Sequence, residues 1–357
     1  HRRPACTGHL GTLVLERILG LAVEGPHRPA VHAAIRHGTT GDIALNWLKM
    51  FSRAAPPPAV ETATTSTAAF LKNANHEALL ASLLAMAWVV EARDPYTGGH
   101  LWRVSRYAAL LCERAGTSLA VCARVSVGAF LHDLGKVGIP DAILRKPSAL
   151  NDDERAVIQT HPELGGRLLA GHPLAHWAID AVQSHHERPD GQGYPQGLVG
   201  DAVPHAARVV GICDAFDAMT STRPYRVAMP VPQALDHIAG ALGRQFDGPL
   251  GRHFLALGAE GLLDHIAGHS DDGIPLQHCL MCGPTLVVRR EQSAGASVYC
   301  RNCGGEYRLD RSIGDQPYRV EPTGRQGQAK DLAPVADTAL IQRFLRDTAV
   351  AALSASA

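Results

Sequence analysis

Aromatic residues are scarce in this chain of 357 residues, at 5% of the sequence. A protein that binds single-stranded nucleic acid by stacking bases on aromatic rings needs more of them. The chain also lacks an excess of charge of either sign, because 34 Lys and Arg residues balance 34 Asp and Glu residues. This balance argues against a globally basic nucleic-acid-binding protein. We therefore do not expect nucleic acid to be a partner.

Long apolar runs are absent as well. No stretch reaches the ~18 apolar residues of a membrane-spanning helix, and Glu16 and Arg17 interrupt the apolar segment from Leu10 to Val23, which excludes the core of a signal peptide. Of the eight cysteines, four are scattered along the chain. Scattered cysteines in a chain of this size indicate reduced thiols, so we expect a cytoplasmic protein without a membrane span.

Composition and periodicity divide the chain into five predicted parts. They are an N-terminal helical segment of unknown role (1–53), a linker (54–75), a helical domain (76–270), a cysteine-rich β module (275–312) and a C-terminal tail (313–357). Apolar residues recur at helical spacing through the third part, whereas β-prone runs occur only after Pro275. The predicted fold class is therefore mainly α, a helical bundle followed by a small β module.

Individual helices and strands follow from the same patterns. Asn151 and Glu154 resemble a capping box that opens a helix. The other helices are expected at Leu10–Val23, Asp42–Phe51, His76–Arg93, His100–Ala115, Ala120–Leu131, Ala175–His185, Ala207–Thr220 and Thr338–Ala351, and strands at Thr285–Arg290, Ser297–Tyr299 and Glu306–Leu309.

Histidine is the residue that the chain has in excess, with 19 copies. Two motifs place two potential metal ligands next to each other in the sequence, namely His132-Asp133 and His185-His186. An isolated histidine is usually a surface or hydrogen-bonded core residue, but two neighbouring ligands at a helix end can diverge, one to each metal of a pair. Imidazoles and carboxylates bind iron, manganese or zinc. Two such cations about 3.5–4 Å apart can activate a water and hold both oxygens of an in-line displacement.

Four motifs lie between residues 94 and 226, namely DPYTGGH, HDLGKVGIP at 132–140, HHERPDGQGYP at 185–195 and DAFDAMTSTRPYR. Together they resemble the HD-GYP subfamily of the HD-domain phosphohydrolases, which are bacterial phosphodiesterases of cyclic di-GMP. HDLGKVGIP resembles the HD core signature, and HHERPDGQGYP resembles the HD-GYP signature. DPYTGGH at 94–100 and DAFDAMTSTRPYR at 214–226 match the flanking motifs, in the family's order. The resemblance implies that residues 76–270 form an HD-GYP domain.

The resemblance also implies roles, position by position. One metal's ligands are matched by His100, His132, Asp133 and Asp214, and the second metal's by His161, His185 and His186, with Asp133 bridging the two. Asp217 is an alternative to Asp214 as the last carboxylate ligand. We prefer Asp214, because Asp214 stands nine residues before Arg223, as the ligand does in the family. Lys136 matches the lysine that contacts the scissile phosphate and, with Asp133, is the expected catalytic residue. Expected substrate contacts are Asp94, Tyr194, Arg223 and Arg226.

The number of catalytic metals follows from the position before His100. Some family members use a carboxylate four residues before that histidine to bind a third metal, and this chain has Tyr96 there. A phenol with a pKa of about 10 is a poor ligand for a hard cation at neutral pH. We therefore expect two divalent transition metals, iron or manganese, in the helical domain.

The expected activity is hydrolysis of cyclic di-GMP to linear pGpG, with GMP as a further product left open, in bacterial signal transduction. An alternative is a cyclic di-GMP receptor that binds without turnover and signals through the β module. A third interpretation keeps the enzyme and changes the substrate to another cyclic dinucleotide. Every matched ligand is present, which favours catalysis.

The remaining cysteines form two C-x-x-C pairs, Cys279/Cys282 and Cys300/Cys303, separated by 17 residues. This spacing is typical of a zinc ribbon, and four thiolates leave no open position, so a structural zinc is expected. The alternatives are unpaired thiols or a redox dithiol. Arg289, Arg290 and Arg301 make the ribbon mildly basic. A protein partner that docks on the ribbon or on the N-terminal segment is therefore left open.

Overall fold

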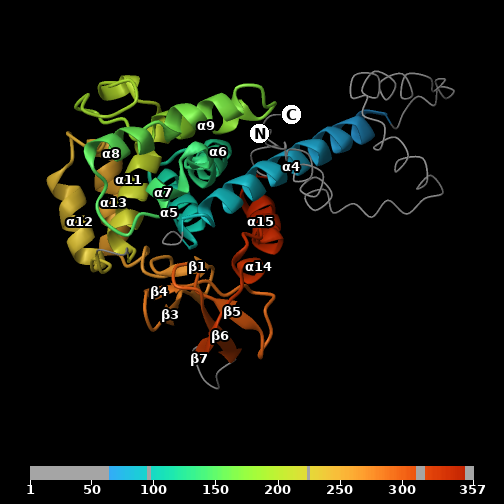
Figure 1. Ribbon diagram of the computed structural model, residues 1–357. Helices are drawn as coiled ribbons and strands as arrows, with labels where there is room; N and C mark the ends of the chain where they lie inside the picture. Colours follow the sequence, from blue (N-terminus) through green and yellow to red (C-terminus); the bar gives the residue numbers. More distant parts are fainter. Residues whose placement is uncertain (1–63, 95–97, 223–225, 311–317, 350–357) are drawn as a thin grey trace, which may run out of the picture. The chain divides into compact units, whose positions relative to one another are not determined.

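The computed structural model changes from helices to short strands at about three quarters of its length (Figure 1). It describes residues 64–94, 98–222, 226–310 and 318–349. The predicted helices at Leu10–Val23 and Asp42–Phe51 lie outside the described residues. No helix in the described ranges combines the length and apolarity needed to cross a membrane.

Seven longer helices build the helical region. They are α4 (Thr64–Glu91), α5 (His100–Arg114), α6 (Leu119–Leu131), α9 (His161–Leu169), α11 (His205–Thr220), α12 (Val231–Gly240) and α13 (Gly248–Ala259). Shorter helices complete it: η2 (Leu134–Gly138), α7 (Asp141–Leu144), α8 (Asp152–Ile158), η3 (Ala175–Trp177), α10 (Ile179–Ser184) and η4 (Gly200–Ala202). The mainly helical fold class is confirmed, and the predicted capping box of Asn151 and Glu154 opens α8. Helix α4 begins at Thr64, inside the segment expected to be a linker.

The core forms where α5, α6, α10 and α11 pack together. Their apolar faces bury Tyr107, Phe130 and Phe216, all 0% exposed. A Cβ on Gly128 of α6 would lie 2.8 Å from the Cβ of Ala181 in α10, so the glycine permits close contact of these two helices. The close contact brings the C-terminal ends of α6 and α10, each followed by a histidine, to the same region of the core.

Short antiparallel strands follow the helices and confirm the predicted β module. Two hairpins are formed by β1 (His269–Asp271) with β2 (Ile274–Pro275) and by β3 (Gln277–Cys279) with β4 (Gly283–Leu286). A three-stranded sheet contains β5 (Ser297–Tyr299), β6 (Gly305–Asp310) and β7 (Arg319–Gln326) in that order. Strand β7 was not predicted and lies beyond residue 312. A second, small core holds this ribbon together, around Leu286, Val288 and Leu309.

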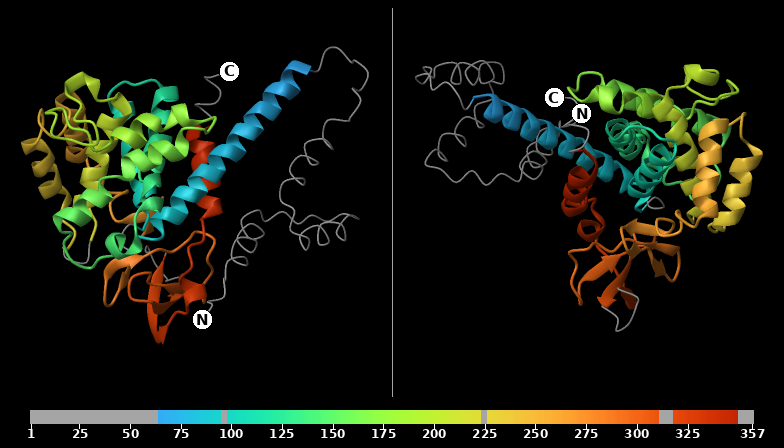
Figure 2. Two further views of the ribbon diagram at one scale, coloured as in Figure 1. Left: turned by 45° about the horizontal axis from the view of Figure 1, so that its top comes forward. Right: turned by 180° about the vertical axis from the view of Figure 1, so that it is seen from behind.

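After the ribbon, the chain returns to the helical region. The short α14 (Ala329–Leu332) leads to α15 (Thr338–Phe344), which continues as the π-helix η5 (Leu345–Ala349). Leu340, Ile341 and Phe344 are buried in the main core, where the ring of Phe344 lies 5.0 Å from that of Phe130. Helix α15 lies beside α4 (Figure 2).

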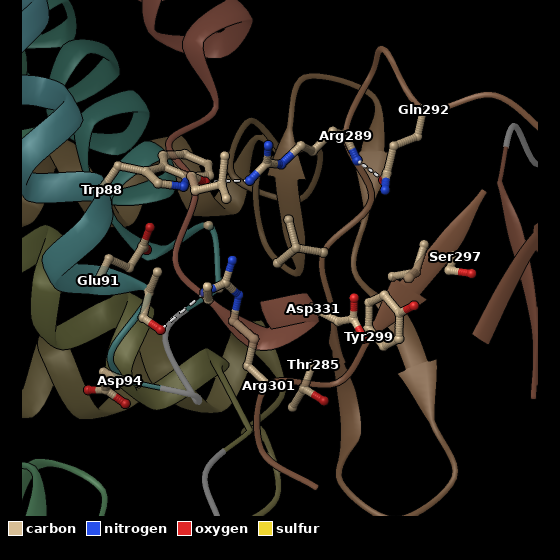
Figure 3. A pocket seen from close by; sticks show the side chains of 17 residues that line it. Trp88, Glu91, Asp94, Thr285, Arg289, Gln292, Ser297, Tyr299, Arg301 and Asp331 are labelled. Carbon is tan, nitrogen blue, oxygen red and sulfur yellow. Dashed lines mark hydrogen bonds between the residues drawn. The ribbon is translucent and has the colours of Figure 1, made fainter. Parts of the chain in front are cut away.

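The ribbon contacts the helical region at the segment that precedes α5. Arg301 donates a hydrogen bond from Nη1 to the carbonyl of Ala92 (3.3 Å), and a Cβ on Gly98 would lie 2.6 Å from Val287. Between the end of α4 and the ribbon lies a cavity of about 280 Å³ (Figure 3). The ribbon is therefore packed directly against the chain that leads to His100.

Candidate metal centre

Histidines and aspartates from several helices converge on one buried region. His100 is the first residue of α5 and His161 the first of α9, whereas His132 and His185 directly follow the last residues of α6 and α10. Asp214 comes from the middle of α11. Four of these five positions are helix ends, where the side chain can reach the space between helices.

The first group of ligands consists of His100, His132 and Asp214. Their ligand atoms lie within 4.8 Å of one another. The Nε2 atoms of the two histidines are 3.3 Å apart, and Asp214 Oδ1 lies 3.5 Å from His100 Nε2 and 3.8 Å from His132 Nε2. These three residues are among the four that the sequence assigned to one metal.

The second group consists of His161, His185 and His186, whose ligand atoms also lie within 4.8 Å of one another. The Nε2 atoms of His161 and His185 are 3.2 Å apart. The three histidines are those that the sequence assigned to the second metal. The structure thus brings together two groups with the predicted division.

Asp133 lies between the two groups and directs one oxygen to each. Its Oδ2 is 3.5 Å from His132 Nε2 and 3.6 Å from His100 Nε2, and its Oδ1 is 3.4 Å from His161 Nε2. Lys136 Nζ lies 2.7 Å from Oδ2. This is the arrangement required of a bridging carboxylate.

The other ring nitrogen of each of four histidines is occupied by a protein acceptor. Nδ1 of His132, His161 and His185 donates to the carbonyls of Ala129 (2.6 Å), Ile158 (2.7 Å) and Ala181 (3.0 Å), and Nδ1 of His100 donates to Asp217 Oδ2 (2.8 Å). Such hydrogen bonds fix the tautomer that leaves Nε2 with its lone pair for a metal. The donor set therefore fits two borderline divalent cations.

Burial keeps the second group of imidazoles neutral. It lowers the pKa of His161 to about 4 and that of His186 to about 3, in the latter case with the help of the neighbouring His161. Burial also disfavours the charged form of His100, but hydrogen bonds to Asp133 and Asp217 outweigh it and raise the pKa of His100 to about 10. Neutral His161 and His186 can bind a metal without first releasing a proton.

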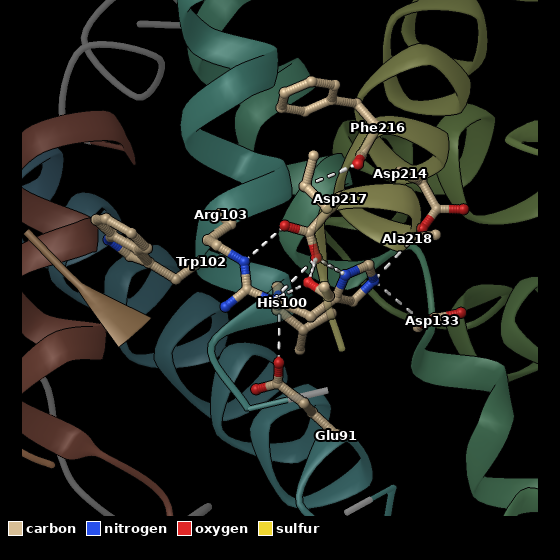
Figure 4. Close-up of polar contacts among 12 residues, drawn as sticks. Glu91, His100, Trp102, Arg103, Asp133, Asp214, Phe216, Asp217 and Ala218 are labelled. Carbon is tan, nitrogen blue, oxygen red and sulfur yellow. Dashed lines mark hydrogen bonds and ion pairs between the residues drawn. The ribbon is translucent and has the colours of Figure 1, made fainter. Parts of the chain in front are cut away.

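Asp217, the alternative carboxylate, accepts the hydrogen bond from Nδ1 of His100, the ring nitrogen that does not face the other ligands (Figure 4). It also pairs with Arg103, whose Nε lies 2.6 Å from Oδ1. Asp214 is the carboxylate that lies on the Nε2 side of His100, where a metal would bind. The geometry therefore supports Asp214 as the ligand and gives Asp217 a positioning role.

Arg103 is a residue that the sequence reasoning missed. It is 1% exposed and donates from Nη1 to the carbonyls of Gly98 and His269 (2.8 Å each) and from Nη2 to Ser221 Oγ (3.1 Å). The spacing of three residues from His100 could have indicated it, because residues i and i+3 lie on the same face of a helix.

Lys136 is held by a tight contact between η2 and α9. A Cβ on Gly135 would lie 1.8 Å from the carbonyl oxygen of His161, so only glycine fits there.

Arg93, which the sequence reasoning also missed, holds the segment that follows Lys136. It donates to the carbonyls of Val137 and Ile139 (2.9 Å each) and pairs with Asp141 (2.7 Å). Burial lowers the pKa of Lys136, but the charges of Asp133 and then of the predicted substrate contact Asp94 outweigh it and raise the pKa above its ordinary value.

Tyr194 stacks on the metal-ligand candidate His186, with ring centroids 4.7 Å apart and an interplanar angle of 28°. Both residues line a cavity of about 400 Å³ that also reaches Asp214. Gly191 has a φ of 76°, which favours glycine, whereas Gly193 is needed because a Cβ would lie 2.4 Å from the amide nitrogen of Arg188. The close approach at Gly193 is thus to the loop's own backbone.

The remaining predicted contacts are placed only in part. Arg226 donates from Nη2 to the carbonyl of Ala218, near the end of α11. Arg223 and Tyr96 lie outside the described residues. The predicted contact through Arg223 and the two-metal expectation based on Tyr96 therefore stay predictions.

The four cysteines of the ribbon form a second cluster. The Sγ atoms of Cys279, Cys282, Cys300 and Cys303 lie within 4.8 Å of one another. Gly283 and Gly304, which follow the two pairs, have φ values of 79° and 77°. Tyr307 donates to Cys279 Sγ (3.2 Å), which stabilises a thiolate there. The group can hold one tetrahedral cation.

Comparisons with known proteins agree with this geometry. Residues 85–250 match the model of the HD domain family. The chain is 42% identical over 168 residues to the cyclic di-GMP phosphodiesterase response regulator RpfG of Xanthomonas campestris, covering 46% of this chain and 44% of that protein. It is 36% identical over 172 residues to a cyclic di-GMP phosphodiesterase of Thermotoga maritima (48% and 47% covered).

A third relative is named for a different substrate. It is 3'3'-cGAMP-specific phosphodiesterase 3 of Vibrio cholerae, 37% identical over 151 residues, which cover 42% of this chain and 33% of that protein. The chain spans less than half the length of these three relatives.

Proposed function

We propose that this chain is an HD-GYP member of the HD domain family, a metal-dependent phosphodiesterase that hydrolyses cyclic di-GMP to linear pGpG in bacterial signalling. The observation that carries the proposal is the position of Asp133, with Oδ2 towards His100 and His132 and Oδ1 towards His161. A carboxylate placed in this way suits a two-metal centre. Relatives named as cyclic di-GMP phosphodiesterases support the substrate.

The residues divide the work of the proposed reaction. One cation would be held by His100, His132 and Asp214, and the other by His161, His185 and His186. Asp133 would contact both cations. Bound cations supply an activated water and a Lewis acid for the phosphodiester. Lys136 is placed to offset charge on the non-bridging phosphate oxygens. Tyr194 offers an aromatic face to a guanine base, and Asp94, Arg223 and Arg226 are the further proposed contacts.

The test is turnover by anaerobically purified protein reconstituted with iron or manganese. We expect linear pGpG to accumulate from cyclic di-GMP when the products are separated by chromatography, with GMP as a slower product to look for. The Asp133→Ala variant should lose both metal and activity, because it lacks the bridging carboxylate. A fully active Asp133→Ala protein would contradict the proposed centre.

Two other outcomes correspond to the competing functions. Tight binding of cyclic di-GMP by metal-loaded protein without any product would indicate a receptor. Faster hydrolysis of 3'3'-cGAMP than of cyclic di-GMP would indicate that 3'3'-cGAMP is the preferred substrate, as the name of the Vibrio cholerae relative suggests. The presence of all seven proposed ligands favours hydrolysis over binding without turnover, and the relatives named as cyclic di-GMP phosphodiesterases favour cyclic di-GMP as the substrate.

We propose that the ribbon holds one structural zinc on Cys279, Cys282, Cys300 and Cys303. The convergence of the four Sγ atoms and the two glycine turns support it. Elemental mass spectrometry should find one zinc per chain in addition to two transition metals, and Cys300→Ser should lose only the zinc. The scattered buried thiols Cys112, Cys122 and Cys213 are unpaired, which supports a cytoplasmic location.

A further inference from the structure

Two arginines of the ribbon line the cavity between the end of α4 and the ribbon (Figure 3). Arg301 belongs to the second cysteine knuckle, between Cys300 and Cys303, and Arg289 follows β4. In Figure 3 both guanidinium groups are directed towards Trp88 and Glu91, and Tyr299 lies on the ribbon side. None of the proposed metal ligands lines this cavity, and of the proposed cyclic di-GMP contacts that the structure describes only Asp94 does.

Neither arginine has a carboxylate within ion-pair distance in the described part of the chain. Arg301 donates to the carbonyl of Ala92 (3.3 Å) and Arg289 to that of Val335. Their neighbour Arg290 differs, since it pairs with Asp271 (3.3 Å) and does not line the cavity. Burial and the positive charge of Arg289 lower the pKa of Arg301. Glu91 acts in the opposite direction, but it lies outside ion-pair distance. Two cations that share a cavity and have no carboxylate within ion-pair distance create a site for an anionic ligand.

The carboxylates that line the cavity are engaged elsewhere. Glu91 Oε1 accepts the amide of Leu101 in the first turn of α5 (3.0 Å), and Asp331 Oδ2 accepts the amide of Gln328 at the start of α14 (2.9 Å). Helix N-termini offset part of the negative charge of such groups. Asp94 lies at the end of the cavity opposite Gln292 and Ser297 (Figure 3).

The remaining lining residues narrow the class of ligand. Arginine guanidinium groups bind phosphate oxygens with two parallel hydrogen bonds. The ring of Tyr299 and the indole of Trp88 provide apolar walls, and Thr285 and Gln292 provide further polar groups. The volume of about 280 Å³ lies at the small end of ligand pockets. It suits one nucleotide better than a cyclic dinucleotide.

We propose that this cavity binds a nucleoside monophosphate, with its phosphate on Arg289 and Arg301 and its base against Tyr299. Gly98 and Gly99 form the wall next to the first residue of α5, His100. A ligand here therefore contacts both the ribbon and the chain that leads into the metal centre. The proposal concerns a second site and does not depend on the hydrolase assignment.

The test is calorimetric titration of the full zinc-loaded chain with GMP, with guanosine and inorganic phosphate as the two halves of the ligand. GMP should bind, and guanosine should not. In the Arg289→Gln/Arg301→Gln double variant, affinity for GMP should fall at least about tenfold, which corresponds to the loss of one charge-assisted hydrogen bond. Arg308→Gln is the matched control, because Arg308 is exposed on β6 of the same ribbon and does not line the cavity.

The Asp133→Ala variant distinguishes GMP binding in this cavity from GMP binding at the metal centre. It should still bind GMP with wild-type affinity. Zinc content and far-ultraviolet circular dichroism show whether the double variant is folded. Failure of GMP to bind wild-type protein, or equal binding of GMP and guanosine, would overturn the proposal. Wild-type affinity in a folded, zinc-loaded double variant would do the same, as would loss of binding in Asp133→Ala alone.

Discussion

Arg103 and Asp217 form a two-pronged ion pair, with Nε 2.6 Å from Oδ1 and Nη2 2.9 Å from Oδ2, and both side chains are 1% exposed. The same carboxylate accepts Nδ1–H of His100. The orientation of a candidate metal ligand therefore depends on a guanidinium that would never touch the metal.

Replacing Arg103 by Met should lower the free energy of unfolding by about 3–5 kcal/mol, because Asp217 is left as a buried carboxylate without its main partner. Chemical denaturation measures the loss. Arg106→Met is the control, since Arg106 lies one turn further on α5 and is only partly buried. Equal stabilities of the two variants would show that the buried pair contributes little.

Lys136→Ala should retain both transition metals but turn over about 100- to 1,000-fold more slowly, because it removes a cation placed to stabilise developing phosphate charge. Rates are compared with metal content from the same preparation. Lys146→Ala serves as control, because Lys146 pairs with Glu154 instead of Asp133. Loss of the metals from Lys136→Ala would instead mean that the lysine organises Asp133.

Gly135→Ala should lose metal and activity together. The added Cβ would lie 1.8 Å from the carbonyl oxygen of His161, so α9 must move and carry its histidine away from His185. Gly171→Ala is the matched control, since a Cβ there meets no atom within 4 Å. Wild-type metal content in Gly135→Ala would indicate that the contact between η2 and α9 can relax.

Tyr194→Phe should leave KM for cyclic di-GMP unchanged, whereas Tyr194→Ala should raise it about tenfold. The reason is that a stacked aromatic face contributes about 1–3 kcal/mol to the binding of a base. Steady-state kinetics with both variants separates the ring from the hydroxyl. Equal defects in the two variants would assign the effect to the hydroxyl group.

Asp337 gives a pH-dependent prediction for α15. Burial raises the pKa of this carboxyl above its ordinary value of 3.8, although its Oδ1 caps the helix by accepting the amide of Leu340 (2.9 Å). The folded state thus holds the proton more tightly than the unfolded one, and stability falls as the pH rises through the folded-state pKa. Asp337→Asn keeps the cap without the charge, so it should melt at a higher temperature than wild type at pH 7 and converge with it towards pH 4. Asp337→Ala should be less stable at both values, by about 1 kcal/mol.

Local patterns predicted much of the helical region, because α5 and α11 carry apolar residues at helical spacing, whereas α6 is buried without interruption from Val125 to Leu131. The division of the ligands between two metals was implied by the family resemblance, and the structure places the same residues in two groups around Asp133. Arg103 was not predicted, because its importance arises from contacts with His269 and Asp217 that are far away in sequence. Strand β7 was missed because it is an edge strand with mostly exposed residues and a proline, Pro322, which resemble a loop.

The ribbon is an insertion with two anchored ends. At its start, the carbonyl of His269 is held by Arg103, and beyond its last strand α15 supplies Leu340, Ile341 and Phe344 to the main core. A domain on a single tether can reorient freely, whereas one closed at both ends behaves as a large loop whose ends are fixed. Truncation before the ribbon would therefore also remove one wall of the helical domain. An internal deletion that joins the residue after β2 to α15 through a short linker is the way to remove the ribbon alone.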